Sequence, residues 1–420
     1  MPEVPLPAAA LRSTPPPRVG AGFVVLYALA HLGTSLVLIA PLLITLALKV
    51  NSLVGIERAP ASLGLVTGTG ALLALLANPF FGRLSDRTLS RWGRRRPWMV
   101  IGLAGGSLGV LVVALAPSVA VVLVGWCIAQ VFFNALLAAE IAVLPDQVPS
   151  EQRGLVSGVL GVCLPLASVS GTFVVQLFAG HQLAMFLAPC VVGAVLVLVF
   201  AVTLKDRRPA SRSEPTWSVR QVVSTFYVDP RRAPDFAWAF TSRFLFVLAY
   251  AFLTTYQAYF LLDRIGSTET EVPGQIFRGT TLQAVAVVAA SLVGGRLSDR
   301  TGRRKVFVVG AAVGYGVAMF MIAGARDVSG YLVGMTVGGL GFGLYVAVDL
   351  ALVADVLPEG DTAKNLGVLN IAGALPFSVA PAIAPVVLRV ADGSYGVLYA
   401  VAGVCALLGA VAILPVRRAR

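Results

Sequence analysis

The chain has 420 residues, of which 57% are hydrophobic and only 12% are charged, and its mean hydropathy is +0.86. A soluble domain carries about 25% charged residues, so most of this chain is expected to face hydrocarbon or other apolar helices. The net charge of +12 sits in short basic clusters between apolar runs, without interleaved aromatic side chains, which argues against a nucleic-acid partner.

The first twenty residues are rich in proline and contain the run Thr14-Pro15-Pro16-Pro17. They lack the charged and apolar regions of a signal peptide. We therefore expect residues 1–20 to form a disordered cytoplasmic tail.

Twelve apolar runs follow, each long enough to cross about 30 Å of hydrocarbon, which takes about 20 helical residues. They predict an all-α integral membrane protein with twelve transmembrane helices. The predicted spans are Ala21–Leu48, Ser62–Phe81, Trp98–Ala116, Val119–Leu144, Gly154–Ala179, Leu183–Leu204, Phe236–Leu262, Ile276–Gly294, Val306–Ala325, Gly330–Val356, Leu366–Val390 and Tyr395–Pro415.

A polar segment separates the sixth span from the seventh. Residues 205–235 are rich in charge and contain four prolines, which predicts a cytoplasmic linker. Residues 21–204 and 236–420 on either side are then two six-helix bundles.

The basic residues are distributed unequally between the two sets of loops. With the amino terminus in the cytoplasm, 25 lysines and arginines fall on the cytoplasmic side and six on the other, while Arg243 lies inside a predicted span. The positive-inside rule then places both termini in the cytoplasm. We expect a multi-pass protein of the plasma membrane.

The heptapeptide Gly-Arg-Leu-Ser-Asp-Arg-Thr occurs twice, each time where an apolar run ends. The copies begin at Gly82 and Gly295, 213 residues apart, and the pairs Leu144-Pro145 and Leu357-Pro358 share that offset. The two halves are therefore copies, related as in secondary transporters whose substrate path lies between pseudo-symmetric halves. The spans place both motifs in the cytoplasmic loops between helices 2 and 3 and between helices 8 and 9.

The repeated pattern Gly-x-Leu-Ser-Asp-Arg resembles the signature loop of the major facilitator superfamily. The first copy continues from Ser85 to Pro97 in a form similar to that of the glycoside-pentoside-hexuronide and sucrose transporter branch, whereas the second copy, Asp299 to Lys305, has the short general form. The resemblance covers nearly the whole chain. It implies two pseudo-symmetric six-helix bundles that move about a central site.

The resemblance also implies roles for the motif acids. Asp86 is expected to lock the cytoplasmic gate against the start of helix 11, and Asp299 to serve helix 5 by symmetry. Each acid also has a motif arginine as a possible ion-pair partner, Arg87 or Arg300. For the arginines alone, a solvated basic loop is the simpler interpretation.

Three family features are missing from this sequence. The predicted span Val119–Leu144 lacks the arginine that plant-type sucrose carriers have in helix 4, so the resemblance does not imply sucrose itself. The predicted span Ser62–Phe81 contains none of the acids that melibiose-type symporters of this branch use for sodium, so a proton is the expected coupling ion. The span Gly154–Ala179 lacks the Gly-Pro-Gly-Gly signature of drug–proton antiporters, which argues against export.

Few ionisable residues lie inside the predicted spans, where a charge costs roughly 2.5–3.5 kcal/mol on insertion scales and usually serves function. Arg243 and Asp349 each lie about eight residues from the cytoplasmic end of their helix, roughly 12 Å deep, and are expected to pair. Asp349 is the first candidate for the proton-coupling acid, with Arg243 modulating it. The alternative is a static ion pair, which would make Glu140 the next candidate.

Uncharged polar residues gather in helices 1, 4, 5 and 7. Hydroxyl-rich ligands need donors and acceptors beside aromatic planes, so this set predicts a sugar site, although bonds between helices explain any single member equally well. The binding candidates are His31, Thr34, Gln130, Asn134, Gln176, Tyr250, Thr254 and Gln257.

Glycine pairs four residues apart predict places where helices pack closely. Such pairs occur at Gly102 and Gly106, at Gly154 and Gly158, and at Gly334 and Gly338.

These features predict a monomeric secondary active transporter that imports a sugar or glycoside with a proton, by rocking of two bundles in the lipid bilayer. An exporter of a small organic molecule or drug is the alternative within transport, and a non-transporting membrane sensor is a further one. No cluster of nucleophile, base or metal ligands indicates an enzyme, a metal site or a cofactor.

Overall fold

The computed structural model describes residues 18–88, 90–206, 233–356 and 362–416, and this part of the chain folds into helices. Twelve helical segments are long and apolar enough to cross a membrane, which confirms the predicted number of spans. Most of the predicted tail and residues 207–232 of the predicted linker lie outside the described residues.

The first bundle contains six spanning segments, of which the first is made of three consecutive helices. Its elements are α1 (Ala21–Ala40), η1 (Pro41–Thr45), α2 (Leu46–Val54), α3 (Ala59–Asp86), α4 (Arg96–Leu115), α5 (Val119–Ile141), the short α6 (Val143–Gln147), α7 (Ser150–Leu177) and α8 (Gln182–Thr203).

The second bundle repeats this order, with its fifth spanning segment divided in two. Its elements are α10 (Pro234–Tyr259), η2 (Phe260–Arg264), α11 (Val272–Thr301), α12 (Arg304–Gly324), α13 (Val328–Val356), α14 (Thr362–Ala374), α15 (Pro376–Val390) and α16 (Tyr395–Ala412).

The first span of each bundle contains one π-helical segment, η1 or η2. In η1 the amide of Leu46 donates to the carbonyl of Pro41, and in η2 the amide of Ile265 donates to that of Phe260. Widened turns of this kind occur frequently at functional sites. Here they lie at the end of the molecule where the two bundles touch.

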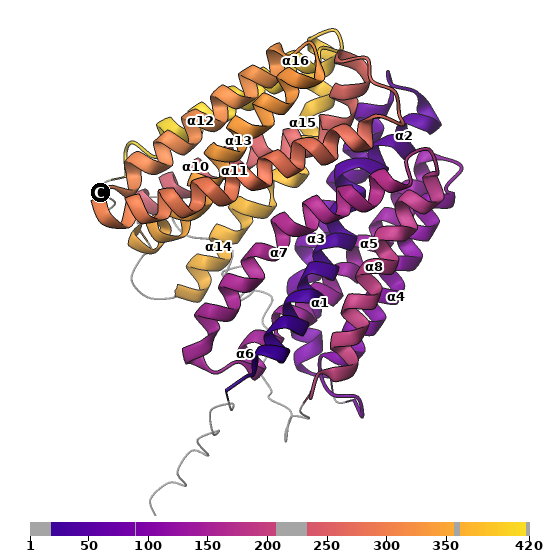
Figure 1. Ribbon diagram of the computed structural model, residues 1–420, viewed down its shortest axis with the longest axis vertical. Helices are drawn as coiled ribbons and strands as arrows, with labels where there is room; N and C mark the ends of the chain where they lie inside the picture. Colours follow the sequence, from indigo (N-terminus) through magenta and orange to yellow (C-terminus); the bar gives the residue numbers. More distant parts are fainter. Residues whose placement is uncertain (1–17, 89, 207–232, 357–361, 417–420) are drawn as a thin grey trace, which may run out of the picture.

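Figure 1 shows the bundles approaching one another where α2 and α15 lie and diverging at the opposite end, where α6 and α14 lie. We call the first the closed end and the second, which carries the repeated motifs, the motif end. Contacts between α3 and α15 and between α7 and α11 join the bundles. These two helix pairs are equivalent under the pseudo-symmetry, so each bundle contributes the same two faces to the interface.

Hydrogen bonds across the interface cluster at the closed end. They join Asn51 Nδ2 to Glu269 Oε1 (2.7 Å), Thr172 to Thr280 (3.0 Å), the Tyr256 hydroxyl to the Pro60 carbonyl (3.4 Å) and the Tyr259 hydroxyl to the Ala47 carbonyl (3.0 Å). Glycine allows the closest approach here, because a Cβ atom at Gly64 would lie only 2.4 Å from the carbonyl oxygen of Pro381.

The motif end of α7 is open. Within the described part of the chain, no atom lies within 4 Å of the positions that Cβ atoms would take at Gly154, Gly158 and Gly161. The prediction of a packing seam at Gly154 and Gly158 is therefore wrong for this conformation, because the bundles diverge around α7. The other two predicted seams are confirmed by close contacts, for example of Gly102 with Leu136.

The repeated motifs extend helices instead of forming loops, which corrects the prediction from sequence. Helix α3 continues to Asp86 and α11 to Thr301, although the apolar runs end at Phe81 and Gly294. The residues Arg-Leu-Ser-Asp contain no helix breaker, so hydropathy marks the end of the hydrocarbon and not the end of the helix. Helix α11 stops at Gly302, whose φ of +65° favours glycine.

Candidate functional site

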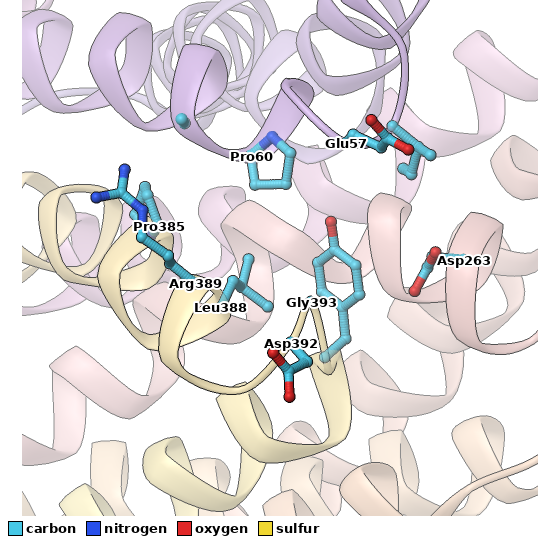
Figure 2. Close-up of a pocket in the computed structure, with 11 residues that line it drawn as sticks. Glu57, Pro60, Asp263, Pro385, Leu388, Arg389, Asp392 and Gly393 are labelled. Atoms are coloured by element: carbon cyan, nitrogen blue, oxygen red, sulfur yellow. The ribbon is translucent and has the colours of Figure 1, made fainter.

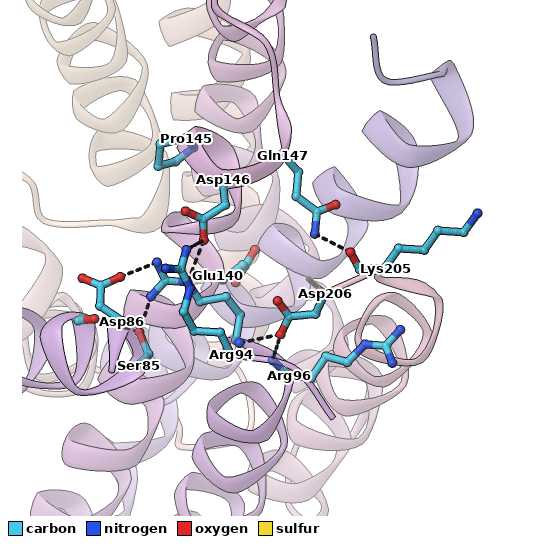
Figure 3. A network of polar contacts seen from close by, with 12 residues as sticks. Ser85, Asp86, Arg94, Arg96, Glu140, Pro145, Asp146, Gln147, Lys205 and Asp206 are labelled. Atoms are coloured by element: carbon cyan, nitrogen blue, oxygen red, sulfur yellow. Dashed lines mark hydrogen bonds and ion pairs between the residues drawn. The ribbon is translucent and has the colours of Figure 1, made fainter. Parts of the chain in front are cut away.

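A network of charged side chains fills the motif end of the first bundle (Figure 3). The guanidinium of Arg95 lies at its centre and bonds to Asp86 Oδ1 (2.5 Å), Asp146 Oδ2 (2.9 Å) and the Ser85 hydroxyl (2.5 Å). Arg94 forms a second ion pair with Asp146, at 2.7 Å. The network therefore ties α3 and the start of α4 to α6.

Asp206, just after the last helix of the bundle, caps the amino terminus of α4. Its Oδ2 accepts hydrogen bonds from the backbone amides of Arg95 (2.6 Å) and Arg96 (3.1 Å). A carboxylate is favoured there by the free amides and the helix dipole. Gly93 makes room for it, because its φ is +100° and a Cβ would lie 2.3 Å from the Asp206 carboxylate.

The last basic residue of each motif is bonded to the end of the sixth helix of its own bundle. Arg96 donates to the carbonyls of Val202 and Leu204, and Lys305 donates to those of Leu414 and Val416. This pseudo-symmetric contact holds the third and sixth spans of each bundle together at the motif end.

The other motif residues are placed as follows. Asp86 and Arg87 lie at the end of α3 and are exposed, and Asp86 bonds to Arg95 across the turn. Asp299 lies near the end of α11, and Arg300 beside it is exposed.

Two of the predicted intramembrane residues, on helices α1 and α5 of the first bundle, form a buried contact. His31 Nδ1 lies 3.1 Å from Glu140 Oε1. The Glu140 side chain is 0% exposed and that of His31 is 19% exposed. The backbone carbonyl of Glu140 accepts a hydrogen bond from the Tyr27 hydroxyl at 2.9 Å, which fixes α5 against α1.

Arg243 of α10 and Asp349 of α13 form the ion pair that the sequence predicts, with Nη1 and Oδ2 2.6 Å apart. Tyr345, one turn earlier on α13, stacks on Phe246 of α10 with ring centroids 3.8 Å apart. Two turns along α10 from Arg243, Tyr250 stacks on Phe342 with ring centroids 4.5 Å apart. An ion pair and an aromatic surface thus lie along one face of α10.

The remaining binding candidates do not form one cluster. Asn134 donates to the backbone and side-chain oxygens of Gln130, one turn earlier on α5. Gln257 is 1% exposed and accepts a hydrogen bond from Tyr331 of α13, so it joins two helices of the second bundle.

The other three candidates lie on three different helices, α7, α10 and α1. Gln176 lies near Gly274 of α11, close to the interface between the bundles. The Thr254 hydroxyl bonds to the carbonyl of Tyr250 in its own helix. The buried hydroxyl of Thr34 has no hydrogen-bond partner among the residues that the structure describes.

Sequence reasoning missed Asp146, Asp206 and Lys49. A signal for Asp146 exists, because the repeated Leu-Pro pairs are each followed by an acid, Asp146 or Glu359. Lys49 lies just beyond the predicted span Ala21–Leu48 and was therefore assigned to a loop. In the structure it is buried in α2, where its amine donates to the Ala114 carbonyl (2.9 Å) and to Gln182 (3.2 Å). It is a structural contact between three spans.

At the closed end, a cavity of about 450 Å³ lies between the bundles (Figure 2). Its polar lining includes Glu57, Asp263, Arg389 and Asp392, which are exposed. In the turn before α11, hydrogen bonds from the backbone amide and the hydroxyl of Thr268 hold the pKa of Glu271 below its usual value. In the described ranges no three His, Cys, Asp or Glu side chains are grouped as metal ligands.

Comparison with known families gives one match that extends over almost the whole chain. The model of the Major Facilitator Superfamily matches residues 23–279 and 279–420.

Curated relatives match shorter segments. The multidrug resistance protein MdtL of Klebsiella pneumoniae (strain 342) is 29% identical over 162 residues, 38% of this chain and 40% of that protein. MdtL of Salmonella agona (strain SL483) is 31% identical over 126 residues, 30% of this chain and 31% of that protein. The chain thus matches less than half the length of these relatives.

Solved structures resemble the chain along nearly its whole length. A mutant of the nucleoside transporter NupG gives a TM-score of 0.74 at 14% identity, with 94% of this chain and 99% of that one covered. A D-xylose–proton symporter gives 0.72 at 12%, with 95% and 99% covered. A bacterial homologue of the human lysosomal transporter Spinster, inward-facing and unoccupied, gives 0.65 at 15%, with 93% of both chains covered. At these identities the likeness shows a common fold of two six-helix bundles.

Proposed function

Because this chain belongs to the Major Facilitator Superfamily, we propose that it imports a sugar or a glycoside together with a proton. Membership makes the chain a multi-pass membrane transporter of small molecules and not an enzyme. The solute, the proton and the direction are the proposal.

The arrangement along α10 carries the proposal. Tyr250 stacks on Phe342, and Phe377 of α15 meets Tyr250 edge-on, with centroids 6.2 Å apart. The Arg243–Asp349 pair follows on the same face of α10, and Arg243 is partly exposed. A sugar presents apolar ring faces for aromatic contact and hydroxyls for charged and polar partners, so this surface has the chemistry that such a solute requires.

The sequence adds support from the first repeated motif. Its extension from Ser85 to Pro97 is similar to that of the glycoside-pentoside-hexuronide and sucrose transporter branch. The fold is shared with a D-xylose–proton symporter, although at 12% identity that likeness speaks for the fold alone.

The distribution of basic residues assigns sides to the two ends. We propose that the motif end is cytoplasmic, with both termini there, in a monomer of the plasma membrane. The conformation is then inward-facing, closed outside by the four hydrogen bonds between the bundles. Asp86 and Arg87 of the first motif, and Asp299 and Arg300 of the second, would close the cytoplasmic side when the bundles rock.

Export of a small organic molecule is the second candidate function. The observation that favours it is the match to MdtL, a multidrug resistance protein, at 29% identity over 40% of its length. Few charges line the spans, as an apolar solute would require.

Counterflow in proteoliposomes, with a panel of labelled sugars and glycosides, tests the proposal. We expect exchange of at least one sugar, and its accumulation when the outside is acidified, abolished by a protonophore. Removal of the aromatic surface by Tyr250→Ala should weaken solute binding about tenfold, or roughly 1.4 kcal/mol. Trp238→Ala, an exposed aromatic residue on the same helix, is the matched control and should have no effect.

The opposite outcome is equally definite. If no sugar exchanges, while inverted vesicles pump a cationic dye in exchange for protons, the chain is an exporter. A sugar that exchanges without response to a proton gradient would reject the proton and keep the solute.

A further inference from the structure

The two buried ion pairs are related by the pseudo-symmetry of the fold. His31 and Glu140 lie on the first and fourth spans of the first bundle, and Arg243 and Asp349 on the first and fourth spans of the second. The motif repeats are 213 residues apart, and His31 and Arg243 differ by 212. The two acids, Glu140 and Asp349, are 209 residues apart, about one helical turn less than the 213-residue offset of the motifs. Each bundle therefore holds one basic and one acidic side chain at equivalent places.

The cations of the two pairs differ in chemistry. Arginine keeps its charge at every accessible pH, so Asp349 always has a cation 2.6 Å away. Histidine exchanges its proton between pH 5 and 8. The basic member of the first pair can thus lose its charge under conditions in which the basic member of the second pair keeps it.

The carboxylates differ as well. Glu140 is fully buried, and within the described residues its Oε2 has no hydrogen-bond partner. An ionised carboxylate with a bare buried oxygen is unfavourable unless a cation stands beside it. The pair therefore retains one proton, either as an imidazolium beside a carboxylate or as a neutral imidazole beside a carboxylic acid. Loss of that proton leaves a buried negative charge.

The surroundings of the pair contain few other titratable groups. Within the described ranges they are Tyr27 of α1, whose hydroxyl bonds to the Glu140 backbone, and Cys163 of α7, with Asp146 further toward the motif end. Neither Tyr27 nor Cys163 is a cation, so His31 is the group that compensates Glu140. The partly exposed face of His31 gives water access to the pair.

We infer that the His31–Glu140 pair carries the coupled proton and that Arg243–Asp349 is its permanently charged counterpart. This inference rests on the proton coupling proposed above, and it chooses Glu140 over the Asp349 carboxyl that the sequence favours. A proton moves from water to the deprotonated pair through His31 and returns to water on the other side after the bundles rock.

Four variants in proteoliposomes test the assignment. Glu140→Gln and His31→Arg should lose proton-driven accumulation at least tenfold and keep solute exchange, which needs no net proton movement. His31→Arg is the sharper of the two, because it gives the first pair the permanent cation of the second. Asp349→Asn alters the proposed solute surface and can slow uptake, but the uptake that remains should still depend on the proton gradient. Tyr27→Phe is the matched control beside the pair and should keep proton-driven accumulation.

A second readout does not depend on the solute. In infrared difference spectra of the purified protein between alkaline and acidic pH, a band from the carboxyl or the imidazole of the pair should be present in the wild type. It should be absent from Glu140→Gln and present in Asp349→Asn. If wild-type protein shows this band but no proton-driven uptake, the proposed coupling fails while the assignment of the titrating group stands.

Three results would overturn the inference. They are undiminished accumulation in Glu140→Gln, undiminished accumulation in His31→Arg, and loss of both the band and the accumulation in Asp349→Asn alone. The last would assign the proton to Asp349. Should Glu140→Gln fail to fold, His31→Arg and the spectra of Asp349→Asn still decide the question.

Discussion

Closure of the bundles at the closed end, which we propose faces outward, depends on the missing side chain of Gly64. A Cβ atom there would lie 2.4 Å from the carbonyl oxygen of Pro381 on α15, whereas ordinary contacts of this kind are 3.4–4 Å. The substitution Gly64→Ala therefore requires α3 and α15 to separate by about 1 Å in this conformation. A state that is open at this end requires these helix ends to move apart, so we expect the methyl group to meet no obstacle there.

The size of the effect follows from the contact. Overpacking of a close helix contact costs about 1–3 kcal/mol. Separation of the helices also lengthens the bond from Tyr256 to the Pro381 carbonyl, already 3.4 Å long. Because the cost falls on one state only, the equilibrium between the two states should shift about 5- to 150-fold toward the outward-open one.

Distances between spin labels measure this shift. Labels at Ser52 and Thr268, exposed positions beside the Asn51–Glu269 hydrogen bond, report the opening of the outer end. Wild-type protein should give mainly the short distance. Gly64→Ala should add a population at longer distance, and transport should slow because the inward-facing state becomes rarer.

The matched control is Gly68→Ala, one turn along the same helix, where a Cβ would lie 3.5 Å from the Ser378 carbonyl in ordinary contact. It introduces the same methyl group and the same gain in helix propensity without the clash. An unchanged distance distribution in Gly64→Ala, or equal changes in both variants, would refute the assignment of Gly64 to the outer gate.

Three further predictions concern the motif end. Asp86→Asn should slow counterflow several-fold while insertion and folding remain normal, because it removes the charge that pairs with Arg95; an unaltered rate would contradict the gating role. Gly93→Ala should lower the free energy of unfolding by about 1–2 kcal/mol, because its Cβ displaces the Asp206 cap. An unfolding temperature equal to that of the wild type would contradict a stabilising role of this cap. A cysteine at Ser213, outside the described residues, should react with an impermeant maleimide only after lysis, and labelling of intact cells would reverse the orientation.

Hydropathy and repetition predicted the architecture because both are local properties of the sequence. The twelve apolar runs correspond to the twelve candidate spans. The equal depth of Arg243 and Asp349 predicted their contact, since residues at one depth on neighbouring helices can meet. Hydropathy does not show where a helix ends after it has left the hydrocarbon. It therefore did not predict that α3 and α11 continue through the motifs.

The sequence did not predict contacts between side chains that only the tertiary structure brings together. Asp206 reaches the amino terminus of α4 only because the chain returns there after α8, and Gly93 is required by that approach. The seven-residue spacing of Arg243, Tyr250 and Gln257 puts these three residues on one face of a helix, yet Gln257 bonds to Tyr331. One helix face borders several neighbours along its length, and the spacing of residues does not say which neighbour each of them meets.

Because the two halves are copies, the differences between their buried acid–base pairs can be compared position by position. Two identical bundles would place the same cation on both first spans, and both pairs would gain or lose protons together. In this chain one copy has arginine at Arg243 and the other has histidine at His31, one turn of register apart at the acids. The copy with the arginine keeps a fixed charge beside the aromatic surface of α10, where a polar solute is proposed to bind. The copy with the histidine is free to change its charge. A carrier built in this way would bind its solute in the second bundle and its proton in the first. Both binding events would then act on the same rocking motion of the two bundles.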